Sequence, residues 1–252
     1  MVKPEMTIAQ SDMASLPSPA KAFNELYHAV RKKENRIYSD RQVMQLPFIE
    51  PLHAHYAEWL IRKSSAEKLI AYLAKHGKDL SILEIGCGNG WLANQLAKIP
   101  GSQVTAIDVN AVELEQATRV FASSDNLTFL NADLESGLLG IEQFDVIIFA
   151  AAIQYFADLN AIIQLALEHL ETDGSIHLVD SFLYRPEEVD NARRRTGEYY
   201  AETGFPRMSD FYFHHSLNSI KKFNHKILYD PNAIINRLTG RKHPFHWILI
   251  RH

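Results

Sequence analysis

The stretch LEIGCGNGWLA, residues 83–93, decides the fold. Three glycines, Gly86, Gly88 and Gly90, follow a short apolar run and precede a helical pattern. Glycines between a strand and a helix let the backbone turn sharply and approach a ligand closely. The start of the following helix offers free N–H groups to that ligand. The stretch therefore predicts a ligand-binding turn between a strand and a helix.

The details of this loop argue against a bound dinucleotide. A dinucleotide fingerprint has the form G-x-G-x-x-G, but here the third glycine comes one residue early, and Trp91 stands where a small residue is needed. Glu84, two residues before the first glycine, is unsuited to a pyrophosphate. A carboxylate beside the loop favours a ligand with positive charge there, such as an amino group.

Outward from the loop, strand-like and helical segments alternate, which is typical of a parallel sheet with helices on both faces. The strand-like runs are almost continuously apolar, as expected for strands that are buried on both sides. The expected strands are 81–85, 103–107, 127–130, 145–150 and 175–182, and the expected helices between them are 91–98, 111–121 and 157–170.

Two further acids follow expected strands of this sheet. Asp108 ends the second strand, 18 residues after Gly90, where a Rossmann-like fold places a carboxylate that binds the ribose hydroxyls. Asp133 follows the third strand, and a carboxylate there can accept a hydrogen bond from the exocyclic amine of adenine. The alternative is that these acids only cap helices, which applies especially to Asp108. Together with Glu84, the acids favour a ligand with adenine, ribose and a partly cationic tail, as in S-adenosylmethionine (SAM).

The sequence resembles the class I SAM-dependent methyltransferases over residues 80–182 and the two final strands. The resemblance rests on motifs at 82–90, 104–110, 129–135, 144–158 and 169–181. It implies an α/β fold with a seven-stranded, mostly parallel sheet, whose last strand is antiparallel and inserted between its neighbours. It also implies SAM as the cofactor, with Ala150 to Ala152 as the wall between cofactor and acceptor. The cofactor-binding residues that it implies are Glu84, Gly86, Cys87, Gly88, Asn89, Gly90, Asp108, Val109, Asp133, Leu134 and Ala150.

Composition excludes several other classes. The chain has 252 residues, a formal net charge of −4 and a single cysteine, Cys87. The net charge provides no basic surface for nucleic acid, and one cysteine allows no internal disulfide. The sequence shows neither a signal peptide nor a membrane-spanning run. We expect a cytoplasmic protein with a small-molecule acceptor and no nucleic-acid or membrane partner; the oligomeric state stays open.

The chain is expected to divide into a flexible tail, a lid and a catalytic domain. Residues 1–20 are polar and form the tail, and 21–79 form an N-terminal helical lid, with helices over 21–35 and 54–76 and a loop over 36–52. The Rossmann-like domain covers 80–252, with a cap-like insertion at about 184–222. The runs 223–230 and 245–251 are expected as two further strands, and the helix between them is weak, which favours an antiparallel pair.

The acceptor side is less well defined. Tyr155 follows the fourth strand, and His53, His214 and His215 are candidates for a general base. For each aromatic and histidine residue in the segments 36–59 and 184–215, the alternative is ordinary packing. The run Arg193–Arg195 fits either an anion-binding site or a solvated helix face. No metal site is expected, because no acidic cluster accompanies the histidines.

The sequence therefore predicts methyl transfer from SAM to a small organic acceptor by in-line displacement. Such a reaction chiefly needs alignment of the reactants and exclusion of water. Three alternatives stay open: a non-catalytic SAM-binding or regulatory subunit, a methyltransferase that acts on protein or RNA, and a nicotinamide-dependent dehydrogenase. The spacing of the glycines and the position of Glu84 argue against the dehydrogenase.

Overall fold

The computed structural model describes residues 19–77, 79–234, 236 and 243–252. The tail predicted for residues 1–20 lies outside these residues, apart from its last two positions. Those two positions begin the first helix, α1 (Pro19–Lys33). No helix within the described residues is long and apolar enough to cross a membrane.

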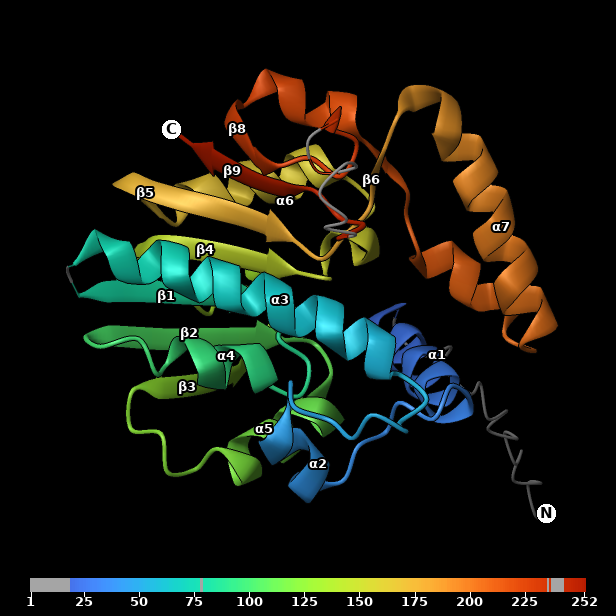
Figure 1. The fold of residues 1–252 in the computed structure, drawn as a ribbon, viewed down its shortest axis with the longest axis horizontal. Helices are drawn as coiled ribbons and strands as arrows, with labels where there is room; N and C mark the ends of the chain where they lie inside the picture. The colour runs from blue at the N-terminus through green and yellow to red at the C-terminus, as the bar shows by residue number, and fades with distance from the viewer. Residues whose placement is uncertain (1–18, 78, 235, 237–242) are drawn as a thin grey trace, which may run out of the picture.

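Seven strands form one mixed sheet in the order β3-β2-β1-β4-β5-β9-β8 (Figure 1). Strands β1 to β5 are parallel to one another, whereas β9 runs antiparallel to both β5 and β8. The predicted seven-stranded sheet with an inserted antiparallel last strand is therefore confirmed. The strands are β1 (Leu80–Ile85), β2 (Ser102–Asp108), β3 (Leu127–Asn131), β4 (Phe144–Ala150), β5 (Leu170–Val179), β8 (Asn224–Tyr229) and β9 (Trp247–Arg251).

Helices cover both faces of this sheet, and the central strands supply side chains to both. In β1, Ile82 enters the hydrophobic cluster on one face and Leu83 the cluster on the other, because successive side chains of a strand alternate. Figure 1 shows α3 across one face and α6 behind the sheet. The first face carries α3 (Tyr56–Leu73), α4 (Trp91–Leu96) and α5 (Ala111–Val120), and the second carries α6 (Leu159–Glu168).

The segment 36–52, expected as a loop, contains a short helix, α2 (Asp40–Gln45). Ser39 and Gln42 form a capping box at its start, a pattern that is visible in the sequence. Asp40 of this helix pairs with Arg119 of α5, so α2 is attached to the sheet domain.

The segment after β5 lies at the edge of the molecule, and its role as a cap-like insertion stays a prediction. It contains β6 (Leu183–Tyr184), helix α7 (Val189–Glu202) and β7 (His215–Ser216); β6 and β7 pair as a separate two-stranded sheet. Figure 1 shows α1 and α7 beyond the arrowheads of the parallel strands, where open α/β sheets bind ligands. Short 3₁₀ helices occupy Ala74–His76, Leu134–Ser136, Ile153–Tyr155, Pro186–Glu188, Pro206–Phe211 and Leu217–Lys222.

Candidate functional site

The glycine loop joins β1 to α4 and has the left-handed backbone that the sequence predicts. Gly86, Gly88 and Gly90 have φ angles of 74°, 53° and 73°. A Cβ atom on Gly90 would lie 2.5 Å from the ring of Phe129, and one on Gly86 would lie 2.8 Å from Cβ of Ala152. Side chains at these positions would therefore disrupt both the local backbone and the packing behind the loop.

Asp108, at the end of β2, holds the loop in place from the neighbouring strand. Its carboxylate accepts hydrogen bonds from the backbone N–H of Gly88, at 2.7 Å, and of Asn110, at 2.8 Å. Burial raises the pKa of Asp108, and these backbone bonds oppose the rise. Asp108 thus organises the loop, and it also lines the cavity beside the loop.

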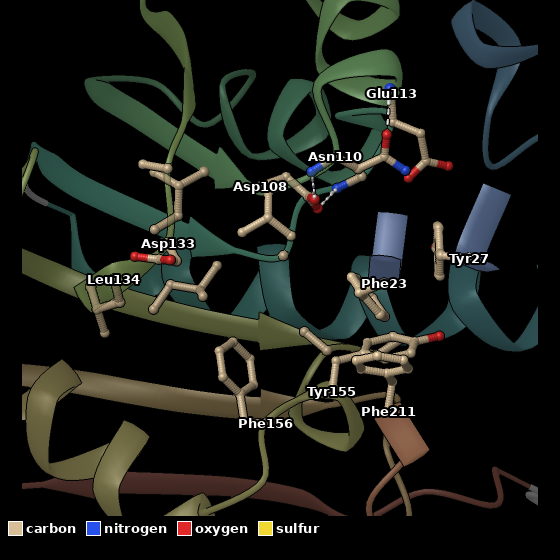
Figure 2. Close-up of a pocket in the computed structure, with 18 residues that line it drawn as sticks. Phe23, Tyr27, Asp108, Asn110, Glu113, Asp133, Leu134, Tyr155, Phe156 and Phe211 are labelled. Atoms are coloured by element: carbon tan, nitrogen blue, oxygen red, sulfur yellow. Dashed lines mark hydrogen bonds between the residues drawn. The ribbon is translucent and has the colours of Figure 1, made fainter. Parts of the chain in front are cut away.

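The first cavity, here the strand-end cavity, has a volume of about 320 Å³ and lies over the ends of β1, β2 and β4. Figure 2 shows Asp133 and Leu134 at one side of it and the aromatic residues Phe23, Tyr27 and Phe211 at the other. Phe23 and Tyr27 come from α1, which is tied to this site by a hydrogen bond from Asn24 Nδ2 to the carbonyl of Val109, 2.9 Å long. Helix α1 therefore forms one wall of the cavity.

A second, smaller space, here the glycine-loop cavity, has a volume of about 100 Å³ and is lined by the loop itself, with Glu84 and Glu113. Glu84 is 2% exposed, and its Oε2 atom has no hydrogen-bond partner among the described residues. Burial and the nearby Asp108 raise the pKa of Glu84 to about 8. Burial raises the pKa of Glu113 to about 7, an effect opposed by Arg31.

Arg31 of α1 projects into the same space and is the cationic counterpart of these acids. Its Nε atom is buried and has no hydrogen-bond partner among the described residues, and its guanidinium lies 5.6 Å from the centre of the Tyr27 ring. A buried charge is costly unless it is paired. An acid and a base that each have an unpaired buried atom, Glu84 Oε2 and Arg31 Nε, thus line one cavity and suit a zwitterionic ligand.

A third cavity, here the arginine cavity, has a volume of about 380 Å³ and lies between α1, α3, β6 and α7. Tyr27, Ala151 and Tyr155 line all three cavities, so the three spaces meet there. Ala151 has a φ angle of 53°, which is unusual for a residue with a side chain and typical of functional sites. The arginine cavity is lined by Arg31, Arg36, Arg62 and Arg195 and by several tyrosines.

The structure brings together most of the predicted cofactor-binding residues. Gly90 is the N-cap of α4 and lines none of the three cavities. Cys87 is buried, which raises its pKa and disfavours the thiolate. Residues that line the strand-end cavity are Gly86, Gly88, Asp108, Val109, Asp133 and Leu134, and residues that line the glycine-loop cavity are Glu84, Gly86, Cys87, Gly88, Asn89 and Ala150.

The four candidate catalytic residues lie in different places. Tyr155 lines all three cavities, whereas the three histidines line none of them. The ring of His53 packs near Tyr38 and His55. His214 Nε2 lies 2.8 Å from Oγ1 of Thr196, and His215 Nε2 lies 2.9 Å from the carbonyl oxygen of Ile153; burial lowers the pKa of both. The catalytic role of these residues stays a prediction.

Sequence reasoning missed the contribution of α1. Phe23, Tyr27 and Arg31 recur at spacings of four, so they share one helix face, but nothing local in the sequence shows that this face covers the carboxyl ends of β1 and β2. Glu113 was missed for a similar reason, because it reads as an ordinary first-turn acid of α5. The described residues contain no group of three or more His, Cys, Asp or Glu side chains that would hold a metal ion.

Residues 82–174 match a methyltransferase domain family. The malonyl-[acyl-carrier protein] O-methyltransferase of Acetivibrio thermocellus is 31% identical over 137 residues, 54% of this chain and 48% of that protein. The enzyme of the same name from Bacillus cereus is 28% identical over 195 residues, 66% of this chain and 71% of that protein. The chain spans about half the length of the first curated relatives that it matches.

Two solved structures have the same fold. The plantazolicin methyltransferase BpumL, in complex with S-adenosylhomocysteine (SAH), superposes with a TM-score of 0.55 and 17% identity, covering 90% of this chain and 99% of its own. The magnesium protoporphyrin IX methyltransferase of Synechocystis PCC 6803, with bound SAM, gives a TM-score of 0.56 and 16% identity, with coverage of 90% and 97%. Residues 82–174 of the chain therefore match a methyltransferase domain, and the chain has the fold of methyltransferases solved with SAM or SAH.

Proposed function

We propose that the protein transfers a methyl group from SAM to an organic acceptor that occupies the arginine cavity. The observation that carries this proposal is the meeting of the three cavities at Tyr27, Ala151 and Tyr155. A cofactor that fills the strand-end and glycine-loop cavities would present its sulfonium methyl group at this junction. An acceptor in the third cavity would then face it from the other side, as in-line displacement requires.

The residues of the two cofactor cavities fit the parts of SAM. Asp108 has two backbone hydrogen bonds and would accept further ones from the ribose hydroxyls. The exposed carboxylate of Asp133 would accept one from the adenine amine. Glu84, whose Oε2 atom is unpaired, would bind the ammonium group of the methionyl tail, and Arg31, whose Nε atom is unpaired, would bind its carboxylate. Arg62 also lines the glycine-loop cavity, but it is already paired with Glu58. In this proposal Arg31 therefore holds the cofactor carboxylate.

At the junction, this chain supplies alignment and shielding. Tyr27 and Tyr155 lie edge-to-face, with their ring centres 5.7 Å apart. Burial raises the pKa of both hydroxyls, so both stay protonated near neutral pH and act as hydrogen-bond donors rather than as bases. With Ala151, they would orient the acceptor atom and exclude water. SAM, when bound, supplies the electrophilic methyl group and the sulfur leaving group.

The arginine cavity supports an enzyme over a non-catalytic SAM-binding subunit, because such a subunit needs no second cavity beside the methyl position. The acceptor is proposed to be a small molecule or a small group presented on a carrier. The curated relatives named above are methyltransferases of malonyl-[acyl-carrier protein], so a carrier-bound acceptor is the alternative to a free one.

Calorimetric titration with SAM and with SAH tests the cofactor assignment. We expect both to bind, and the variant Asp108→Ala to bind at least about tenfold more weakly, because hydrogen bonds to a charged group contribute about 1.5–3 kcal/mol each. The matched control is Asp125→Ala, since Asp125 is exposed and lines none of the three cavities. Absence of binding to the unmodified protein, or equal binding by the Asp108 variant, would contradict the proposal.

A further inference from the structure

Helix α7 presents one face to the arginine cavity. The residues of α7 that line this cavity are Ala192, Arg195, Thr196, Tyr199 and Tyr200. Their spacing of three and four residues defines a single helix face. Arg195 is the only cation on this face.

The two neighbouring arginines point elsewhere. Arg193 pairs with Asp190 at 3.5 Å, and Arg194 pairs with Glu198 at 2.8 Å, both on exposed parts of α7. Arg195 has no ion-pair partner among the described residues of the chain. All three arginines of the run are exposed, but Arg195 lines the arginine cavity, whereas Arg193 and Arg194 do not.

The acids of the arginine cavity are already partnered. Glu34 pairs with Arg36, and Glu58 pairs with both Arg36 and Arg62. Asp180, the third acid, accepts a hydrogen bond from Ser65 and lies 3.5 Å from His243. Four arginines and three carboxylates line the cavity; Arg36 and Arg62 pair with Glu34 and Glu58, so Arg31 and Arg195 are the arginines that these carboxylates leave unpaired.

Hydrogen-bond donors add to this positive charge. The hydroxyls of Tyr184, Tyr200 and Tyr212 line the cavity and have no hydrogen-bond partner within the part of the chain that the structure describes. Burial raises the pKa of all three, so they remain protonated and can donate. The wall beside α7 thus offers a guanidinium and neutral hydroxyls to a ligand.

We propose that the acceptor carries a carboxylate group, which Arg195 binds in the arginine cavity. This inference rests on the proposed function. A guanidinium offers two parallel N–H donors that match the two oxygens of a carboxylate. Arg31, the other unpartnered arginine, also lines the glycine-loop cavity and is taken by the cofactor tail, so Arg195 is left for the acceptor. The aromatic side chains of the cavity, among them Phe182 and Phe245, fit an apolar body attached to this carboxylate.

Helix α7 lies outside residues 82–174, the stretch that matches the domain family. Within the run Arg193–Arg195, only Arg195 has this role. Arg195 determines which acceptors bind, whereas Arg193 and Arg194 do not.

A matched pair of probes tests this proposal. The protein is saturated with SAH and titrated with 3-phenylpropanoate and with its neutral amide, 3-phenylpropanamide, which has nearly the same shape. We expect the acid to bind about tenfold more tightly than the amide. The variant Arg195→Gln should lose this preference, and the control variant Arg194→Gln should keep it. Both variants should bind SAH as the unmodified protein does, which shows that they are folded.

The outcomes separate this inference from the proposed function. If the unmodified protein fails to bind SAH, the proposed function is wrong, and the present inference falls with it. If SAH binds but the acid shows no preference over the amide, only the carboxylate assignment is overturned. A preference that persists in Arg195→Gln overturns the role of that residue, and tighter binding of phenyl phosphate than of the acid overturns the choice of carboxylate.

Discussion

Replacing Glu84 by glutamine should change how the stability of the protein depends on pH. Glu84 is almost fully buried, and burial together with Asp108 raises its pKa to about 8, against an ordinary value of 4.5. Between these two values the folded state holds a proton that the unfolded state has released. The favourable contribution of this proton is therefore complete below pH 4.5 and is lost progressively as the pH rises toward 8.

The size of this effect follows from the difference in pKa. Each unit corresponds to about 1.4 kcal/mol, so Glu84 should account for a loss of about 3 kcal/mol in the free energy of unfolding between pH 5 and pH 8. Glutamine has the same shape and does not titrate. The variant Glu84→Gln should therefore lose about 3 kcal/mol less than the unmodified protein over this range.

Urea denaturation at pH 5 and pH 8 measures this difference. The raised pKa of Glu113 affects both proteins alike, so the comparison isolates Glu84 apart from its coupling to Asp108. Equal losses of stability in the two proteins would show that Glu84 is ionised in the ligand-free site, and the argument from its burial would be refuted. The same variant should bind SAH more weakly, because the cofactor ammonium loses its anionic partner.

Three further predictions concern the glycine loop, helix α1 and the turn before α5. Gly90→Ala should lower the free energy of unfolding by about 2–4 kcal/mol, because the added Cβ would meet the ring of Phe129 and the φ angle is 73°. The control Gly140→Ala, where φ is 57° and the space around the added Cβ is open, should lower it by only about 1 kcal/mol. Similar losses for the two variants in urea denaturation would contradict the packing argument. Arg31→Met should weaken SAH binding by about tenfold or more. In calorimetry, its affinity for 5′-methylthioadenosine, which lacks the amino-acid tail, should stay unchanged. An equal loss of affinity for both ligands would show that Arg31 does not bind the tail. Asn110→Ala removes the side chain that accepts from the first turn of α5 and should lower the melting temperature, with a cost of about 1 kcal/mol; an unchanged melting temperature would show that this cap is dispensable.

Much of the fold could be predicted from the sequence because its signals are local. The apolar runs of β1 and β4 indicate strands that are buried on both faces, and the structure has them as the centre of the sheet. The glycine loop was predictable because a left-handed backbone favours glycine whatever surrounds it. Asp108 was predictable for a similar reason, since the end of a strand determines where its side chain lies relative to the neighbouring loop.

The placement of α1 and α7 could not be predicted in this way. Which side chains of a helix face a cavity depends on the elements packed around it, and those come from distant parts of the chain. The ring centre of Phe23 in α1 lies 5.6 Å from that of Phe211, which is 188 residues (211 − 23) further along the chain. The candidate histidines show the same dependence on tertiary packing. His214 contacts the hydroxyl of Thr196 and His215 contacts the carbonyl oxygen of Ile153, and neither lines one of the three cavities.

By itself, the residue pattern indicated a parallel sheet with helices on both faces, the glycine loop and the positions of Glu84, Asp108 and Asp133, because these depend on backbone conformation and on spacing along the chain; the order of the strands came from the resemblance to a known family. Only the tertiary structure decided that Arg31 and Arg195 line the arginine cavity while Arg193 and Arg194 pair with acids on the outer surface of α7. Identical side chains on one helix differ only in the direction that helix packing gives them. The free energy that orients them comes from contacts between segments that the linear order of residues does not bring together.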